Sequence, residues 1–195
     1  TKPNIRFQGF EDDWKQRKLG ELAPLRGGFS FRSKNFKYSG IPIVRISNIL
    51  DTGKVGGNFV YYDAQKNDEN YFLPDGATVL AMSGATTGKV AILYSNGNKC
   101  YQNQRVGYFT KTKQADYVFV STVVRSKLFF SQLNSVLVSG AQPNISSKEV
   151  DKFKFLVPSM IHEQQKIGQF FKQLDKMIAL HQRQLELLKE QKKGF

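Results

Sequence analysis

The chain is poor in the residues that hold metal ions and disulfides. Among its 195 residues there are one cysteine, Cys100, and two histidines, His162 and His181. A single cysteine excludes an internal disulfide framework and is typical of a protein in a reducing cytosol. Structural zinc sites need about four Cys or His ligands, so we expect no such site, no other bound metal and no cofactor.

Long hydrophobic runs are also missing. No apolar stretch approaches the roughly eighteen residues that a membrane-spanning helix needs. No secretory signal precedes the first predicted strand. The sequence therefore predicts a cytoplasmic protein with no membrane partner.

The usual catalytic signatures are absent as well. Residues 84–90 resemble a phosphate-binding loop, but three residues rather than four separate the glycines, and Val90 replaces the Ser or Thr that would ligate Mg²⁺. The acidic residues are scattered along the sequence, whereas a metal-dependent nuclease needs clustered carboxylates. Both histidines lie near the C-terminus, so a His-based triad does not fit the rest of the chain. We expect no catalytic residues and no enzymatic activity from this chain alone.

Basic charge is what the chain has in excess. It contains 29 Lys and Arg against 16 Asp and Glu, for a net charge of +13. No acidic residue occurs in residues 22–50, 76–115 or 117–148. Such blocks are the electrostatic footprint expected of a protein that binds a phosphate backbone. Charge alone also allows a protein that binds acidic partners or acidic membrane surfaces, although it favours nucleic acid.

Short strand-like segments dominate residues 1–158. Runs rich in Val, Ile, Leu and aromatic residues, bounded by Gly, Asn or Pro, predict strands at 41–46, 59–62, 78–82, 89–94, 105–109 and 154–157. Helical spacing predicts a helix over 117–137, and shorter helices are expected after residues 11–13 and over 64–70. Trp14, the only tryptophan, is expected to anchor the core. The predicted fold class is an α/β (α+β) globular domain with many short strands, over residues 1–158, followed by one long coiled-coil-forming α-helix at 159–195.

Polar loops between these strands carry side chains suited to base edges. Residues 102–105 place three carboxamides beside a guanidinium. Carboxamides pair bidentately with adenine and Arg with guanine. Asn, Ser, Thr and Gly also simply make turns, which is the alternative for any single residue. Four such loops on a strongly cationic domain nevertheless favour DNA. The predicted DNA contacts are Arg26, Arg32, Lys34, Arg45, Ser47, Asn48, Ser83, Thr86, Thr87, Lys89, Gln102, Asn103, Gln104, Arg105, Ser139 and Gln142.

The C-terminal segment has a heptad pattern. Its predicted pairing seam, with alternating spacings of four and three, is Ile167, Phe171, Leu174, Ile178, His181, Leu185 and Leu188. This alternation predicts a coiled-coil helix of about 45 Å that needs a partner helix. A second apolar row widens the seam: Phe170, Met177, Leu180 and Leu187. We expect antiparallel self-association, with His181 either neutral in a loose layer or acting as a pH switch.

Several segments, taken in order, resemble one family. Residues 6–10 (Arg-Phe-Gln-Gly-Phe), followed by Trp14 and residues 18–22 (Lys-Leu-Gly-Glu-Leu), resemble the opening of a recognition domain in specificity subunits of type I restriction-modification systems. Internal landmarks are similar at 43–49, 83–91, 103–104 and 139–142. Pro158, with residues 163–167 and 174–175, resembles the start of that family's spacer helix.

The resemblance implies a non-catalytic domain that reads one half of a split duplex DNA site. It implies a helix that acts as a ruler to the other half, methyltransferase subunits docked around it, and restriction subunits bound through them. A typical member has two recognition domains and two antiparallel helices, so the chain is expected to be one half of such a subunit or a half-subunit paired with a second copy. The alternative left open is a protein-interaction scaffold whose basic face binds acidic partners non-specifically.

Overall fold

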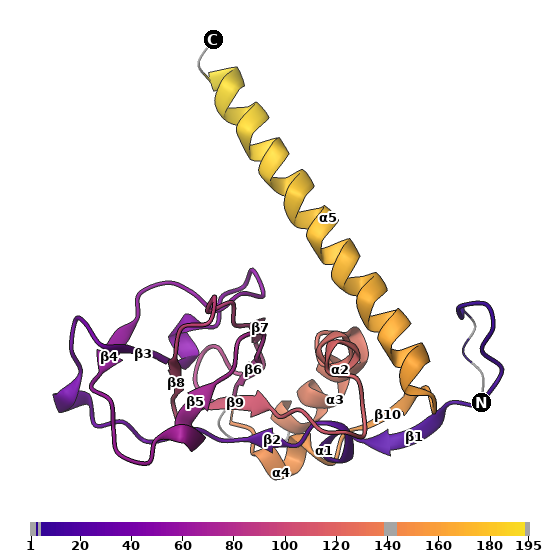
Figure 1. Cartoon of the computed structure of the whole chain (residues 1–195), viewed down its shortest axis with the longest axis horizontal. Helices are drawn as coiled ribbons and strands as arrows, with labels where there is room; N and C mark the ends of the chain where they lie inside the picture. Colours follow the sequence, from indigo (N-terminus) through magenta and orange to yellow (C-terminus); the bar gives the residue numbers. More distant parts are fainter. Residues whose placement is uncertain (1–2, 4, 139–143, 194–195) are drawn as a thin grey trace.

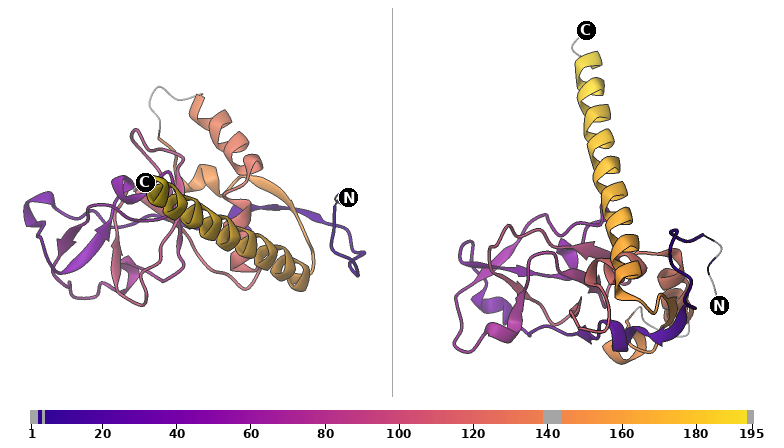
Figure 2. Two further views of the ribbon diagram at one scale, coloured as in Figure 1. Left: turned by 90° about the horizontal axis from the view of Figure 1, so that it is seen from above. Right: turned by 45° about the vertical axis from the view of Figure 1, so that its right-hand side comes forward.

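The protein consists of a globular body and one long helix that leaves it at one end (Figures 1 and 2). The computed structural model describes residues 3, 5–138 and 144–193. The described strands form a central four-stranded sheet, a second four-stranded sheet and a two-stranded ribbon. Figure 1 shows the second sheet at one end of the body and the ribbon at the other, below the start of the long helix.

The central sheet has the strand order β2–β9–β6–β7 and is antiparallel throughout. Its strands are β2 (Leu25–Arg26), β9 (Val106–Phe109), β6 (Thr78–Ala81) and β7 (Val90–Ile92). Alternate residues of the two middle strands join different cores. Leu80 and Phe109 pack among the helices, whereas Val79 and Val106 pack on the opposite face. Because both faces are covered, β6 and β9 are buried at every position and read as continuous apolar runs.

The second sheet has the order β4–β3–β8–β5, with β3 and β8 parallel. Its strands are β3 (Ile41–Val44), β4 (Val60–Tyr62), β5 (Phe72–Leu73) and β8 (Cys100–Gln102). Aromatic residues fill its core, where Phe31 packs on Tyr62 and the rings of Phe72 and Tyr101 stack with their centroids 4.9 Å apart. Short 3₁₀ turns η1 (Ser33–Asn35), η2 (Ile46–Asn48) and η3 (Glu69–Tyr71) connect these strands.

A helical layer covers the other face of the central sheet. It contains α1 (Leu19–Leu22), α2 (Tyr117–Val123), α3 (Lys127–Val138) and α4 (Ser147–Val150). Asp116 caps α2 by accepting a hydrogen bond from the Phe119 backbone N–H at 2.9 Å, and Ser146 with Glu149 forms a capping box on α4. Phe129 of α3 is fully buried in this layer, with its ring against that of Phe109.

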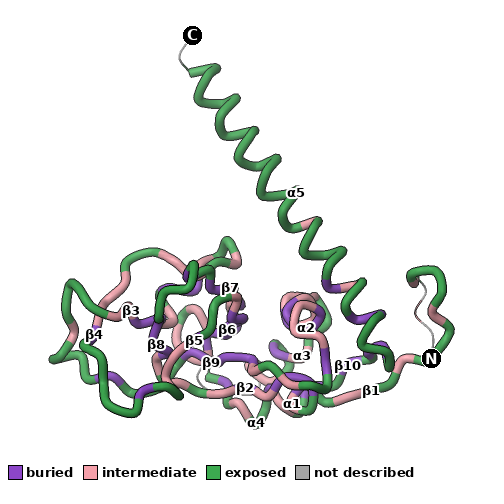
Figure 3. The backbone as a smooth tube through the Cα atoms, viewed as in Figure 1, coloured by how far each residue is buried: buried purple, intermediate pink, exposed green. Residues whose placement is uncertain are grey.

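The ribbon pairs β1 (Lys15–Lys18), from the start of the chain, with β10 (Lys154–Val157), and it leads into α5 (Ile161–Lys193). The first turns of α5 pack against α2 so closely that a Cβ at Gly168 would lie 2.7 Å from the Phe119 backbone nitrogen. From residue 175 to 193 every α5 residue is exposed, as Figure 3 shows by its green colour. At the usual rise of 1.5 Å per residue, the 33 residues of α5 span about 50 Å.

The structure confirms the predicted fold class, and each of the six predicted strands overlaps a strand of the structure. The predicted helix over 64–70 is wrong, because that segment forms only the short η3 turn beside β5. The predicted single helix over 117–137 is two helices, with a break between Val123 and Lys127. Trp14 is only partly buried, and its indole N–H donates to Glu163 rather than anchoring the core. No helix in the described part of the chain combines the length and apolar character needed to cross a bilayer.

Candidate nucleic-acid interface

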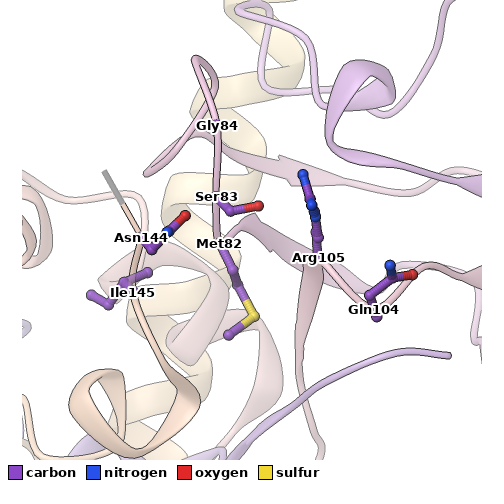
Figure 4. A pocket seen from close by; sticks show the side chains of 7 residues that line it. All are labelled: Met82, Ser83, Gly84, Gln104, Arg105, Asn144 and Ile145. Carbon is purple, nitrogen blue, oxygen red and sulfur yellow. The ribbon is translucent and has the colours of Figure 1, made fainter. Parts of the chain in front are cut away.

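A cleft of about 660 Å³ opens beside the edge where β6 and β9 meet (Figure 4). It lies between the β6–β7 turn, the loop before β9 and the segment that leads into α4. The residues that line it are Met82, Ser83, Gly84, Gln104, Arg105, Asn144 and Ile145. Members of two predicted DNA-binding loops, about 20 residues apart in sequence, therefore meet at one place. This described lining contains one cation and no carboxylate.

The β6–β7 turn owes its shape to two glycines and a threonine. Gly84 and Gly88 have φ angles of +77° and +91°, a region that favours glycine. Between them, the Thr87 hydroxyl donates to the Gly84 carbonyl at 2.6 Å. The Gly88 backbone N–H donates to the Ala81 carbonyl at 2.9 Å and closes the turn. Ser83 is thereby held at the cleft, whereas the Thr87 hydroxyl is used inside the turn.

The loop before β9 is fixed through its backbone. The Phe29 backbone N–H donates to the Gln102 carbonyl at 2.9 Å, and the Gln104 backbone N–H donates to the Phe29 carbonyl at 2.9 Å. The Arg105 carbonyl accepts from the Met82 backbone N–H, also at 2.9 Å. The side chains of Gln104 and Arg105 are exposed. The loop thus presents two polar side chains on a backbone whose own hydrogen bonds are made.

The polar side chains of the cleft have no side-chain partners among the residues that the structure describes. The Ser83 hydroxyl is buried with no hydrogen-bond partner in the described structure, and Figure 4 shows it pointing toward Arg105. Within the described part of the chain, the side chains of Gln104, Arg105 and Asn144 make no hydrogen bond or ion pair. A buried unpaired hydroxyl costs about 1–3 kcal/mol, which a ligand's polar atom would offset. The cleft is therefore suited to a polar, electron-rich ligand.

A third predicted loop adjoins the cleft. The Thr86 hydroxyl lies 3.4 Å from the Ile46 carbonyl, and Gly84 approaches the Ile46 side chain. The next residue, Ser47, is exposed in η2. Close to this turn, Lys89 pairs with Asp51 at 2.7 Å. Ser139 and Gln142 of the fourth predicted loop lie outside the described residues, although Asn144 just after them bridges to Ser83.

Two predicted base contacts belong to the framework instead. Asn48 is fully buried, and its carboxamide donates to the carbonyls of Gly56 and Asn58 at 3.0 and 3.1 Å. Gln102 is also fully buried and donates to the carbonyls of Arg26 and Val106, each at 2.8 Å. Both carboxamides are thus used in hydrogen bonds to backbone carbonyls inside the fold.

Arg26 likewise serves the fold. Its guanidinium donates to the Gln102 side-chain oxygen and to the Phe72 carbonyl, each at 2.8 Å, and lies 5.0 Å from the centre of the Tyr108 ring. Burial lowers the pKa of Arg26 below its ordinary value, and Tyr108 partly offsets this shift. The Arg26 guanidinium is thus engaged inside the fold, and we do not include it among the proposed phosphate contacts.

The remaining predicted contacts do not line the cleft. Arg32 and Lys34 are exposed at η1, on the second sheet's side of the molecule. Arg45 is half-buried 6.0 Å from the centre of the Phe36 ring, and its Nε has no partner in the described structure. Asn103 accepts a hydrogen bond from the Arg105 backbone N–H at 3.3 Å and so supports the loop.

Two further residues of the candidate site are not among those predicted from the sequence. Asn144 reaches the cleft from the segment before α4, and its only sequence signal is that it follows a polar loop. Gly28 allows the close approach of the loop before β9, because a Cβ there would overlap the carbonyl oxygens of Gln102 and Asn103. A pair of adjacent glycines signals a turn, but it does not tell which backbone comes near.

The described residues offer no alternative chemistry in the form of a metal or thiol centre. No group of three or more His, Cys, Asp or Glu side chains among them could hold a metal ion. Cys100 is buried, and burial raises the pKa of its thiol, which disfavours the reactive thiolate.

Comparison with known proteins gives one consistent family. Residues 11–190 match the model of the type I restriction modification DNA specificity domain. The chain is 26% identical, over 189 residues, to the type I restriction enzyme MjaVIII specificity subunit of Methanocaldococcus jannaschii. The match covers 93% of this chain and 44% of that protein, so the chain spans less than half the length of this relative.

Solved structures show the same fold at low sequence identity. The HsdS subunit from Thermoanaerobacter tengcongensis matches with a TM-score of 0.63 at 14% identity, over 93% of this chain and 41% of that one. The S subunit of a type I restriction-modification system from M. genitalium matches with a TM-score of 0.61 at 15% identity, over 89% of this chain and 42% of that one. Because the family model covers all but the ends of the sequence, the chain belongs to the type I restriction modification DNA specificity domain family.

Proposed function

We propose that this chain recognises one half of a bipartite duplex DNA site for a type I restriction-modification complex and is not catalytic on its own. The observation that carries the proposal is the cleft, where polar side chains from distant loops meet beside Arg105; among the described residues these side chains have no partner, and the lining holds no carboxylate. Ser83, Gln104 and Arg105 are the proposed base-reading residues of the sequence prediction, and Asn144 joins them. Arg32, Lys34, Arg45 and Lys89 are proposed to neutralise phosphates, which fix position rather than sequence.

We further propose a division of labour along the chain. Residues 1–158 form the target-recognition domain, and residues 159–195 form a spacer whose length sets the distance to a second recognition domain. Methyltransferase subunits dock around this helix, and restriction subunits join through them. Two features of α5 support this assignment, its length of about 50 Å and its exposed apolar rows beyond the body.

The first prediction concerns binding to duplex DNA. Affinity is expected to fall steeply with salt, because each neutralised phosphate contributes about −0.9 to the slope of log K against log salt concentration. Fluorescence anisotropy over a salt series measures this slope. Selection from random duplexes, with the chain alone and with the modification subunits of the same system, is expected to enrich one short motif.

Two outcomes would contradict the proposal. Equal binding to all duplexes at moderate salt would remove the claim of sequence recognition. A lack of DNA binding even with the modification subunits present would favour an interaction scaffold that binds acidic partners.

The second prediction concerns self-association through α5. The seam residues Ile178 and Leu185 are 55% and 53% exposed, so an aspartate on the seam is expected to disfavour helix pairing strongly. Sedimentation at tens of micromolar should give a dimer for the wild type and a monomer for Ile178→Asp. Ala179→Asp places the same charge one residue away, off the seam, and should stay dimeric. A monomeric wild type would instead require a different partner helix.

A further inference from the structure

Arg105 differs from the other cations of the proposed DNA surface because its exposed side chain lines the cleft and has no partner among the described residues. Lys89 already pairs with Asp51, and Arg45 is half-buried beside an aromatic ring. Arg32 and Lys34 are exposed on a short 3₁₀ turn outside the cleft. Within the described part of the chain, Arg105 is the one cation that lines the cleft.

The backbone of Arg105 is held more firmly than its side chain. Its carbonyl accepts from the Met82 N–H at 2.9 Å, and its own N–H donates to the Asn103 side chain at 3.3 Å. The next residue, Val106, is fully buried at the start of β9. The base of the side chain is therefore anchored to the central sheet. Reading a base edge requires such anchoring, because the donors must lie within about 0.5 Å of their productive positions.

The guanidinium also has a specific chemical match. Its donors form a planar fork, which fits the two acceptors O6 and N7 that guanine presents in the major groove. No other base pair edge offers two adjacent acceptors of this kind. The described lining of the cleft holds no carboxylate that would compete for the fork. The Ser83 hydroxyl, which is buried and has no partner among the described residues, faces the same space (Figure 4).

We propose that Arg105 reads a guanine in the target half-site, and that the Ser83 hydroxyl gains its missing partner from the same stretch of DNA. This inference rests on the proposed function and names the base class that its cleft selects. A phosphate contact by Arg105 is the competing role, and the two roles differ in what a substitution does to sequence preference and to salt dependence.

The test compares sequence selection by the wild type, Arg105→Gln and Arg105→Lys, with the modification subunits present. The wild type should enrich one position as guanine. Arg105→Gln should lose about 5- to 150-fold in affinity for that sequence and relax this position, with the salt slope unchanged. Arg105→Lys keeps the charge but loses the fork, so it should also relax the guanine position. Ser83→Ala should weaken binding to the selected sequence but not to unrelated duplexes.

Two matched variants complete the test. Lys34→Gln, at a proposed phosphate contact, should weaken all sequences alike and reduce the salt slope by about 1. Lys15→Gln, in the β1–β10 ribbon, should change neither quantity. Thermal melting of the Arg105 variants should match the wild type, because this side chain is exposed.

The possible results distinguish a wrong role for Arg105 from a wrong function for the chain. If Arg105→Gln weakened all duplexes equally and lowered the salt slope, Arg105 would be a phosphate contact, and the inference would fail while recognition of a motif stood. If the guanine preference survived in both Arg105 variants, the inference would also fail. If the wild type selected no motif, the proposed function would fail together with the inference.

Discussion

Replacing Gly28 with alanine is expected to abolish selection of the target motif and to lower the free energy of unfolding by about 2–5 kcal/mol. A Cβ at this position would overlap the carbonyl oxygens of Gln102 and Asn103. Both obstacles are backbone atoms, so no side-chain rotation relieves the clash. The segment that contains Gly28 and the loop that begins at Gln102 must therefore move apart.

That separation acts directly on the cleft. The Phe29 backbone is hydrogen-bonded to the carbonyl of Gln102 and to the N–H of Gln104, and these bonds hold the loop that presents Arg105. Moving the loop costs about 0.5–1.5 kcal/mol for each lost hydrogen bond, in addition to the overpacking. It also displaces the proposed base-reading groups, and a displacement of 1 Å is enough to impair a site that depends on position.

Gly27 provides the matched control for this prediction. A Cβ there would meet no atom within 4 Å. Gly27→Ala should therefore keep wild-type melting and wild-type selection, whereas Gly28→Ala loses both. Chemical denaturation measures the stability difference, and selection from random duplexes measures the loss of preference. If Gly28→Ala selected the same motif with wild-type affinity, the loop would not depend on this close approach.

Sequence patterns predict the elements that are either exposed along their length, as most of α5 is, or buried on both faces, as β6 and β9 are. The heptad alternation predicts α5 correctly, because a long isolated helix leaves its apolar spacing undisturbed. The continuous apolar runs of β6 and β9 predict strands, because both faces of the central sheet are covered. The η3 segment fails for the opposite reason. Its helical composition is overridden by the short β5 strand that follows and must pair with β8.

In the candidate site, residue type alone does not predict which side chains are exposed. Gln102 and Gln104 are identical side chains two residues apart, yet one is fully buried under Arg26 and the other is exposed at the cleft. In a continuous strand, residues two apart point to the same side. Because β8 ends at Gln102, Gln104 lies beyond the strand and is not held to the buried side. The parallel pairing of β8 with β3, which links residues far apart in the chain, decides this arrangement. Local sequence carries no signal for it.

The basic charge in the sequence likewise does not tell which cations are available to bind DNA. Arg26 and Arg105 are both arginines in regions without acidic residues, and both were predicted to contact DNA. Packing gives Arg26 two internal acceptors and an aromatic ring, whereas Arg105 has none of these within the described structure. A count of cations therefore predicts that a surface binds phosphate, but only the tertiary contacts tell which cations remain available.

The second large effect is expected for Glu163→Gln, at the junction between the body and α5, whose part beyond the body is called the arm below. Glu163 lies in the first turn of α5 and is fully buried. Its carboxylate accepts two hydrogen bonds from the Arg6 guanidinium, at 2.7 and 2.8 Å, and a third from the Trp14 indole N–H at 3.2 Å. The side chains of Phe7 and Phe170 pack edge to face beside this pair. The start of the arm is thus tied to the N-terminal segment as well as to α2.

Glu163→Gln leaves the Arg6 guanidinium without its charged partner, although water can compensate part of this loss because Arg6 is only partly buried. Glu163→Gln should therefore lower the melting temperature by several degrees. Glu186→Gln, at an exposed position farther along α5, should change it little. The double variant Arg6→Met with Glu163→Leu removes both charges and should recover much of the loss.

The same substitution should loosen the direction in which the arm leaves the body. Distances between spin labels on α3 and on the exposed part of α5 should broaden in Glu163→Gln and stay narrow in Glu186→Gln. If α5 has the proposed spacer role, a loosened base should no longer fix the distance between two half-sites. Assembled complexes carrying Glu163→Gln should then accept several spacer lengths while still selecting the same half-site motif. If melting fell but both the label distances and the accepted spacing stayed sharp, packing of Gly168 on α2 would alone be sufficient to set the direction of the arm.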